Sequence, residues 1–270
     1  MGYIQDLDLE EDEKMFRTNE IQAIYVMWLR QMKRFVRSKS RLLVTVIQPL
    51  MFLFILGFGF RQVAFPGLEG VEYTHFFAPG IVAMSILFSS MFTGVSILWD
   101  KQFGFLQEVL VAPISRFSII IGRTLGGATT ALIQGSAILI IAIVALGIPI
   151  SSPISLILAF IFMVLISFTS VGFGLLIASK MNDFQSFPII MNLVIMPLLF
   201  LSSAFFPVAN NSTFQTIAYF DPIFYMVDGL RGSLLGKANV LPFSIDLAVV
   251  LIICILMLSL GSYSFRKSEA

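Results

Sequence analysis

Few side chains of this 270-residue chain could catalyse a reaction, ligate a metal or bind a nucleotide. His75 is the only histidine and Cys254 the only cysteine, so neither a disulfide within the chain nor a histidine–cysteine metal site can form. The stretch "GSLLGKAN" (232–239) resembles a phosphate-binding loop, but it is one residue short and lacks the Ser or Thr after the lysine. We therefore expect no catalytic residue, no metal and no cofactor bound by this chain.

A short charged stretch, "FLQEVLVAPISR" (105–116), lies between two long apolar runs. On a helix its apolar side chains share one face and its polar ones lie largely elsewhere, and Pro113 ends the helix. Such an element could lie on lipid as a linker, or it could dock into a groove on a cytoplasmic partner. Its charged corner includes Glu108 and Arg116.

The apolar runs contain no ionisable side chain apart from cysteine and tyrosine. A charge in the middle of a bilayer costs about 2.5–3.5 kcal/mol on insertion scales and marks proton relays and ion-coupled transport. These mechanisms therefore have no evident residues here. Gln48, Gln134 and Asn192 are the notable polar side chains of the runs, and they could hydrogen-bond between helices or contact a cargo along a pathway.

The elements that must position these residues follow from hydropathy. Hydrophobic residues make up 57% of the chain and charged residues 12%, with a mean hydropathy of +0.93, which predicts an all-α integral membrane protein. Crossing the hydrocarbon core takes about 20 apolar residues. Six runs qualify as spans: 42–60, 76–98, 124–148, 154–179, 184–206 and 247–265.

Basic residues predict the orientation. If the spans alternate, only Arg61, Arg231 and Lys237 of the 17 lysines and arginines lie on the outer side. We therefore expect both termini in the cytoplasm, including the short C-terminus 266–270, and a location in the cytoplasmic membrane. The acidic start of the chain gives no sign of a cleaved signal peptide.

The segment before the first span predicts an interfacial helix. Residues 1–13 read as an acidic solvated tail, whereas residues 14–41 alternate apolar and basic side chains at helical spacing and include Trp28. A basic amphipathic helix with a tryptophan suits the cytoplasmic surface of a membrane, although packing on another cytoplasmic domain would give the same pattern.

The outer connection 207–246 is too apolar for a simple loop. It predicts short amphipathic helices, broken at Asp221 and Pro222, that dip back into the outer leaflet. Small residues at four-residue spacing predict close helix packing on the faces Gly127, Ala131, Gly135 and Ser170, Gly174, Ala178.

Two stretches carry a resemblance to a known family. "DKQFGFLQEVLVAPISRFSIIIGRTL" (100–125) resembles the cytoplasmic-loop motif of type-2 ATP-binding cassette (ABC) export permeases, including the daunorubicin-resistance and nodulation-factor exporters. "YFDPIFYMVDGLRGSLLG" (219–236) is similar to that family's second recurring segment: Pro222 with Tyr225, and Asp228 with Arg231, match its Pro-x-x-Tyr and Asp-x-x-Arg. The resemblance covers nearly the whole chain.

The resemblance implies a division of labour. The loop 99–123 would couple this chain to a separate ATPase, present in two copies, that binds ATP and magnesium, with Glu108, Pro113, Ser115 and Arg116 at or near the contact. The outer segment, with Asp228 and Arg231, would cap the pathway in a structural role or contact substrate. The chain would form a homodimer in membrane lipid, with no nucleic-acid partner.

The expected function is that of a permease subunit, not an enzyme. It would move an amphipathic or lipid-linked molecule, of the drug, lipid or glycan class, out across the membrane, with Gln48 and Asn192 in the pathway. Alternatives are transport in another direction, a lipid-releasing assembly factor, a membrane enzyme acting on lipid head groups, or a non-transporting scaffold.

Overall fold

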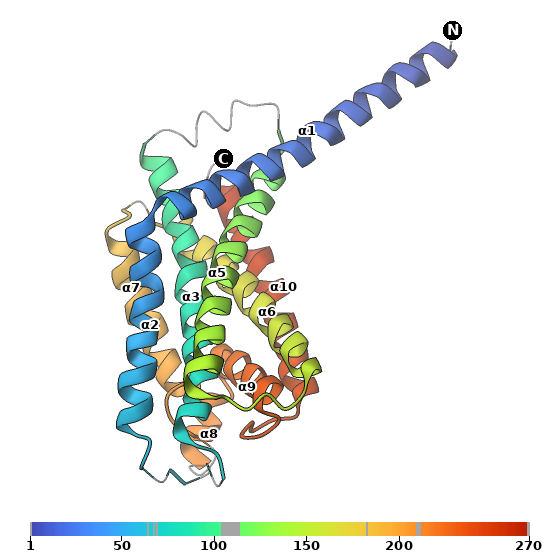
Figure 1. Cartoon of the computed structure of the whole chain (residues 1–270). Coiled ribbons are helices and arrows are strands. Elements are labelled where there is room, and N and C mark those ends of the chain that lie inside the picture. Colours follow the sequence, from blue (N-terminus) through green and yellow to red (C-terminus); the bar gives the residue numbers. More distant parts are fainter. Residues whose placement is uncertain are drawn as a thin grey trace.

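The fold of this chain is a bundle of long helices. The computed structural model describes residues 2–268 except 64, 67, 69, 104–113, 182 and 209–211, and all regular structure among them is helical (Figure 1). The helices are α1 (Gly2–Arg37), α2 (Lys39–Gly59), α3 (Tyr73–Gln102), α5 (Arg116–Leu146), α6 (Pro153–Ala178), α7 (Ser186–Leu201), α8 (Ser212–Ala218), α9 (Pro222–Leu235) and α10 (Phe243–Ser268).

Within these described residues, several helices are long and apolar enough to cross a membrane. These segments are Leu42–Gly59, Tyr73–Asp100, Arg116–Leu146, Pro153–Ala178 and Phe243–Phe265. The chain is therefore an all-helical, multi-pass membrane protein, as its composition predicted. The remaining predicted span, 184–206, contains α7, whose 16 residues extend only about 24 Å. This is less than the roughly 30 Å of the hydrocarbon core, so the count of six spans stays a prediction.

Polar residues at the bundle ends lie inside the helices rather than in loops. The helix α5 begins at Arg116, before the apolar run that starts at residue 124, because Ser115 caps it and accepts a hydrogen bond from the Ser118 amide. It ends at Gly147, which adopts the left-handed conformation with φ of 63°. Arg123 therefore belongs to α5. Asp100 belongs to α3, because that helix continues to Gln102.

The centre of the bundle is α3. About 71% of its apolar segment is buried, against 17% for α2 and for α10, so these two helices are peripheral. It packs against α2, α5, α6 and α9, while α10 packs against α6 and α9 (Figure 1). The helix α1 crosses one end of the bundle over α5 and continues away from it toward the N-terminus, through the residues predicted as an acidic tail.

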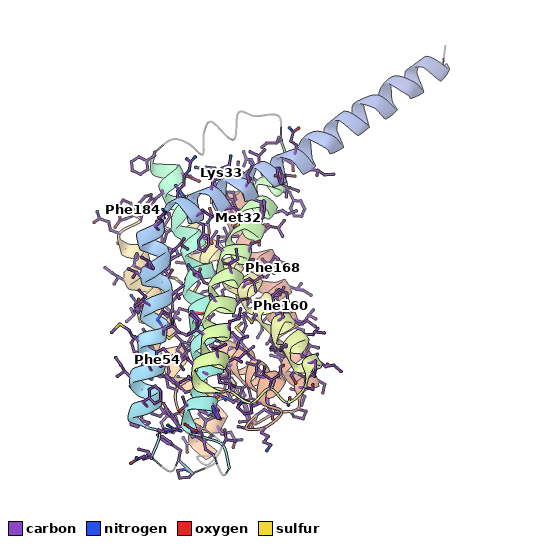
Figure 2. All side chains as sticks on the ribbon, viewed as in Figure 1. Met32, Lys33, Phe54, Phe160, Phe168 and Phe184 are labelled. Carbon is purple, nitrogen blue, oxygen red and sulfur yellow. The ribbon has the colours of Figure 1, made fainter. Side chains whose placement is uncertain are left out.

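The outward faces of the peripheral helices are apolar. Along α2 the large apolar side chains that are exposed are Leu43, Val44, Ile47, Met51, Phe52, Ile55 and Phe58. Phe160 of α6 is also half exposed, and side chains of this kind project around the bundle (Figure 2). In water such faces would be unstable, so lipid or a second chain must cover them.

Close helix packing depends on glycines, as the small-residue faces predicted. The helices α3 and α6 cross at Gly94 and Gly174, where a Cβ atom added to Gly94 would lie 2.5 Å from the Gly174 carbonyl oxygen. A Cβ atom on Gly127 of α5 would collide with Thr93 of α3. Both α5 and α6 therefore approach α3 at distances that only glycine allows.

Replacing Gly94 with Ala should destabilise the bundle. The added methyl group meets backbone that cannot move aside, which should cost about 1–3 kcal/mol of unfolding free energy. The matched control is Gly59→Ala, since nothing lies within 4 Å of a Cβ atom there. Thermal unfolding in detergent should show a lower midpoint for Gly94→Ala alone, and equal midpoints for both variants would contradict this packing.

Candidate coupling and transport site

The predicted docking stretch lies where α3 leads into α5. Glu108 and Pro113 fall outside the described residues, whereas Ser115 and Arg116 are described at the start of α5 and are both exposed. The structure thus places the second half of this predicted group at the end of the bundle that α1 crosses.

Ser115 joins the start of α5 to α1. Its backbone amide and its hydroxyl each donate a hydrogen bond of 2.7 Å to the carboxylate of Glu20. Interactions with the side chains of Ser118 and Ser115 lower the pKa of Glu20, so this carboxylate is ionised at neutral pH. A residue of the predicted docking stretch is therefore held by α1.

A partly buried ion-pair hub lies farther along α1 and α5, at the same end of the bundle. It consists of Asp100 of α3, Arg30 and Arg34 of α1, and Arg123 of α5. Arg30 donates two hydrogen bonds to the Asp100 carboxylate, with N–O distances of 2.8 and 3.0 Å, and Arg123 Nη2 lies 2.9 Å from Asp100 Oδ2. Arg34 Nη2 is farther away, at 3.9 Å.

The hub fixes helices that flank the predicted docking stretch. The side chains of Asp100 and Arg123 are 5% and 6% exposed, so their charges are largely shielded from water. A buried carboxylate needs such partners because it would otherwise bear an uncompensated desolvation cost. The pairs therefore hold α1, α3 and α5 in one arrangement at this end of the bundle.

Packing reinforces the contact between α1 and α5. A Cβ atom on Gly122 would lie 2.6 Å from the Met27 Cβ atom, and one on Gly126 would lie 2.7 Å from the Gln31 Cβ atom. The Trp28 indole N–H donates a hydrogen bond of 3.2 Å to the Thr129 hydroxyl. The helices α1 and α5 thus form one close-packed unit.

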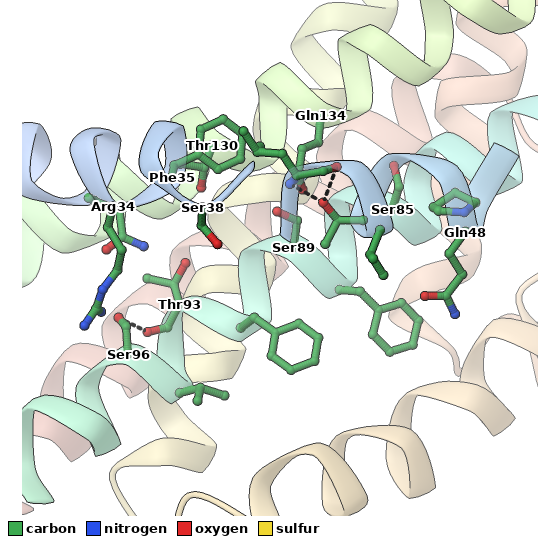
Figure 3. A pocket seen from close by; sticks show the side chains of 18 of the residues that line it. Arg34, Phe35, Ser38, Gln48, Ser85, Ser89, Thr93, Ser96, Thr130 and Gln134 are labelled. Atoms are coloured by element: carbon green, nitrogen blue, oxygen red, sulfur yellow. Dashed lines mark hydrogen bonds between the residues drawn. The ribbon is translucent and has the colours of Figure 1, made fainter. Parts of the chain in front are cut away.

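A cavity of about 530 Å³ lies between α2, α3, α5 and α7, with α1 at one end (Figure 3). Gln48 of α2 and Asn192 of α7, the predicted pathway residues, both line it. One face of α3 contributes Ser85, Ser89, Thr93 and Ser96. The structure therefore brings Gln48 and Asn192 to a shared cavity, lined by polar and apolar side chains, within the membrane domain.

Gln134 of α5 supplies a buried polar group at this cavity. Its side-chain amide donates a hydrogen bond of 2.8 Å to the Thr45 hydroxyl of α2 (Figure 3). Its carbonyl oxygen is buried and accepts no hydrogen bond from the described residues. Gln134 thus links α2 to α5.

Asp228 and Arg231 lie in α9, at the opposite end of the bundle, and both side chains are fully buried. The Asp228 carboxylate accepts hydrogen bonds from the amides of Val240 and Leu241, at 2.8 and 2.9 Å. Its shortest approach to the Arg231 guanidinium is 3.8 Å. Asp228 therefore mainly holds the chain that leads from α9 to α10.

Arg231 holds α3 and the end of α7. It donates hydrogen bonds to the Phe76 carbonyl oxygen and to both the hydroxyl and the carbonyl of Ser203, and it lies 3.7 Å above the Phe76 ring. Ser203 has a φ of 58°, a strained value for a serine. The bonds from Arg231 stabilise this turn, which ends α7.

Pro222 and Tyr225 have local structural contacts in the same segment. Pro222 occupies the first turn of α9, directly after the capping residue Asp221, whose carboxylate accepts a hydrogen bond of 2.8 Å from the Ile223 amide. The Tyr225 hydroxyl donates to the Tyr219 carbonyl oxygen at 2.9 Å. The short helices α8 and α9 meet at this break, close to where the sequence placed it.

Sequence reasoning missed the hub itself. The pattern of residues 14–41 does not distinguish Arg30 from the other cations there, and Arg123 stands before the run 124–148 with no predicted partner. A signal was present: Asp100 is a lone acid at the end of one apolar run, and Arg123 stands just before the next. An acid and a base placed in this way on consecutive spans can pair at the same end of a bundle.

Comparison with known proteins agrees with this architecture. The profile of the ABC-2 type transporter family matches residues 22–235. The chain is 30% identical over 259 residues to the transport permease ycf38 of Cyanophora paradoxa, which covers 92% of this chain and 89% of that protein. It is 29% identical over 215 residues to nodulation protein J of Rhizobium leguminosarum bv. trifolii, covering 78% of each.

A further relative is the inner membrane transport permease YadH of Escherichia coli strain K12, 27% identical over 224 residues, or 81% of this chain and 85% of that protein. The helical membrane fold and these relatives define a membrane transport permease rather than an enzyme. The chain belongs to the ABC-2 type transporter family.

Replacing Asp100 with Asn should strongly destabilise the end of the bundle that α1 crosses. The variant removes the carboxylate charge that pairs with the buried Arg123, and breaking a buried ion pair typically costs about 3–5 kcal/mol. The matched control is Glu72→Gln, because the Arg61–Glu72 pair is partly exposed and such pairs contribute about 1 kcal/mol or less. Thermal unfolding in detergent compares them; an Asp100→Asn midpoint as high as that of Glu72→Gln would contradict a stabilising hub.

Proposed function

We propose that this chain is the permease subunit of an ATP-driven exporter in the cytoplasmic membrane. It would work as a homodimer with two copies of a separate ATPase, which binds ATP and magnesium. The observation that carries this proposal is the hub of Asp100, Arg30 and Arg123, which joins the interfacial helix to both helices that flank the predicted docking stretch. Family membership supports it, because ABC-2 permeases normally work with an ATPase subunit.

The proposal includes the predicted topology. The helix α7 and the residues up to 206 would form the fifth of six crossings, and both termini would face the cytoplasm. The docking stretch, with Glu108, Pro113, Ser115 and Arg116, then meets the ATPase on the cytoplasmic side. The short helices α8 and α9 cap the outer end, where Asp228 and Arg231 brace the backbone.

Coupling would proceed through the hub. ATP binding closes the two ATPases and moves the docked stretches, and the hub transmits this motion to α1, α3 and α5 as one unit. The polar cavity lies between this unit and the peripheral helices α2 and α7. Motion of the unit relative to α2 and α7 would change the width of the cavity and open a path for the cargo.

The proposed cargo is an amphipathic or lipid-linked molecule. The cavity combines hydrogen-bonding side chains such as Gln48, Thr93 and Asn192 with large apolar ones such as Phe88 and Trp99. A cargo with a polar head group and an apolar body matches both surfaces. None of the described lining residues is acidic, so nothing in this lining favours a cationic cargo.

Charge reversal at Glu108 tests the coupling. Glu108→Lys should reduce ATPase co-purification or ATP hydrolysis at least tenfold, a loss of about 1.4 kcal/mol, because it places the wrong charge at the docking stretch. The variant should still insert and elute as the parent protein does in size-exclusion chromatography. Glu72→Lys, at the opposite end of α3, makes the same charge change as a control.

The ATPase partner is identified by affinity purification in mild detergent, followed by an ATP-hydrolysis assay. Full ATPase recovery and activity with Glu108→Lys would overturn the docking assignment. Failure to recover any ATPase from the parent protein, even after cross-linking, would overturn the proposal as a whole.

A second prediction concerns the cavity. Gln48→Leu should lower the stimulation of ATP hydrolysis by amphipathic compounds about tenfold, since a lost hydrogen bond contributes about 1–1.5 kcal/mol. Basal hydrolysis should not change. The control is Gln215→Leu, which makes the same substitution on α8, away from the cavity. Equal stimulation in both variants would exclude Gln48 from the cargo path.

A further inference from the structure

A strongly basic depression lies at the turn from α1 to α2. It is lined by Val26, Leu29, Arg30, Lys33, Arg34, Arg37, Ser38 and Lys39. Basic side chains dominate this lining, and none of the described lining residues is acidic. Figure 2 shows Lys33 on α1, at the end of the bundle opposite α8.

The hub neutralises only part of this charge. Asp100 forms a bidentate pair with Arg30 and also pairs with Arg123, while Arg34 stays 3.9 Å away. Glu20 is an acidic residue of α1 itself, but its carboxylate accepts hydrogen bonds from Ser115 instead of pairing with these cations. It lies about 15 Å along the helix axis from Arg30, given a rise of 1.5 Å per residue. The depression therefore keeps a surplus of positive charge.

The surroundings of the depression favour a membrane ligand. Apolar side chains stand exposed along the same helix, including Ile21, Val26 and Val36, each more than half exposed. The membrane-spanning part of α2 begins at Leu42, three residues after Lys39. Cations that stand beside exposed apolar groups at the start of a span lie at the depth of lipid phosphates.

We propose that this depression binds the phosphate of an anionic phospholipid from the cytoplasmic leaflet. The forked guanidinium groups of Arg34 and Arg37 and the ammonium groups of Lys33 and Lys39 match a phosphate that carries a net negative charge. Because Arg30 and Arg34 also face Asp100, the bound head group lies beside the hub. The lipid thereby anchors α1, the helix that the hub connects to α3 and α5.

This inference rests on the proposed cytoplasmic position of α1, but not on the cargo or on the ATPase. The test uses the full chain, delipidated and reconstituted into nanodiscs of phosphatidylcholine with increasing phosphatidylglycerol of the same acyl chains. Native mass spectrometry then measures which lipid stays bound. A triple variant, Lys33→Gln with Arg37→Gln and Lys39→Gln, leaves the hub residues intact, and Lys180→Gln serves as the control outside the depression.

The parent protein and Lys180→Gln should retain phosphatidylglycerol selectively. The triple variant should lose this selectivity by on the order of 100-fold, since each cation near an anionic surface contributes about fivefold. Equal selectivity in the triple variant would overturn the proposal. So would displacement by millimolar inorganic phosphate, which would identify a site for a soluble anion, or loss of the lipid when the ATPase binds, which would assign the cations to a protein contact.

The test separates this inference from the proposed function. If lipid selectivity is absent while the ATPase co-purifies and responds to Glu108→Lys, only the lipid site is wrong. If lipid selectivity is present and no ATPase is recovered, the lipid site stands and the coupling role fails.

Discussion

The arrangement of helices at the end of the bundle that α1 crosses depends on the carboxylate of Asp100. In a membrane domain a buried charge is stable only when its partners are close, and here these partners come from α1 and α5. The pairs therefore do more than neutralise charge, because they help to determine how α1 lies across the bundle. Without them, α1 would keep its glycine contacts with α5 but lose its connection to α3.

The opposite end is fixed in a different way. Arg231 reaches the backbone of α3 and of the turn after α7, and Asp228 holds the chain between α9 and α10. With both ends held, the polar cavity lies between a close-packed core of α3 and α5 and the sparsely buried helix α2. A rigid core beside a peripheral helix is the kind of boundary at which a permease can open.

Much of this organisation could be predicted from the sequence, and the reasons are local. Long apolar runs predict membrane helices, and the break at Asp221 and Pro222 predicted the start of α9 because proline cannot continue a helix from the preceding turn. Gln48 and Asn192 stood out because polar groups are rare in such runs. The hub could not be derived in the same way, since Asp100 and Arg30 are 70 residues apart and meet only through tertiary packing. The length of α7 also escaped prediction, because its end depends on the left-handed Ser203, which Arg231 stabilises from α9.

In the proposed coupling, α1, α3 and α5 move as one unit when the proposed ATPase partner closes. Spin-label distances measured by pulsed electron resonance test it most directly, in a Cys254→Ser background with one labelled protomer. We expect the distance from Val36→Cys on α1 to Phe117→Cys on α5 to stay constant within about 2 Å on ATP binding, the scale of small helix shifts. The distance from Phe117→Cys to Ile189→Cys on α7 should change by more than this. A change in the distance between α1 and α5, with no change in the distance between α5 and α7, would contradict movement of α1 and α5 as one unit.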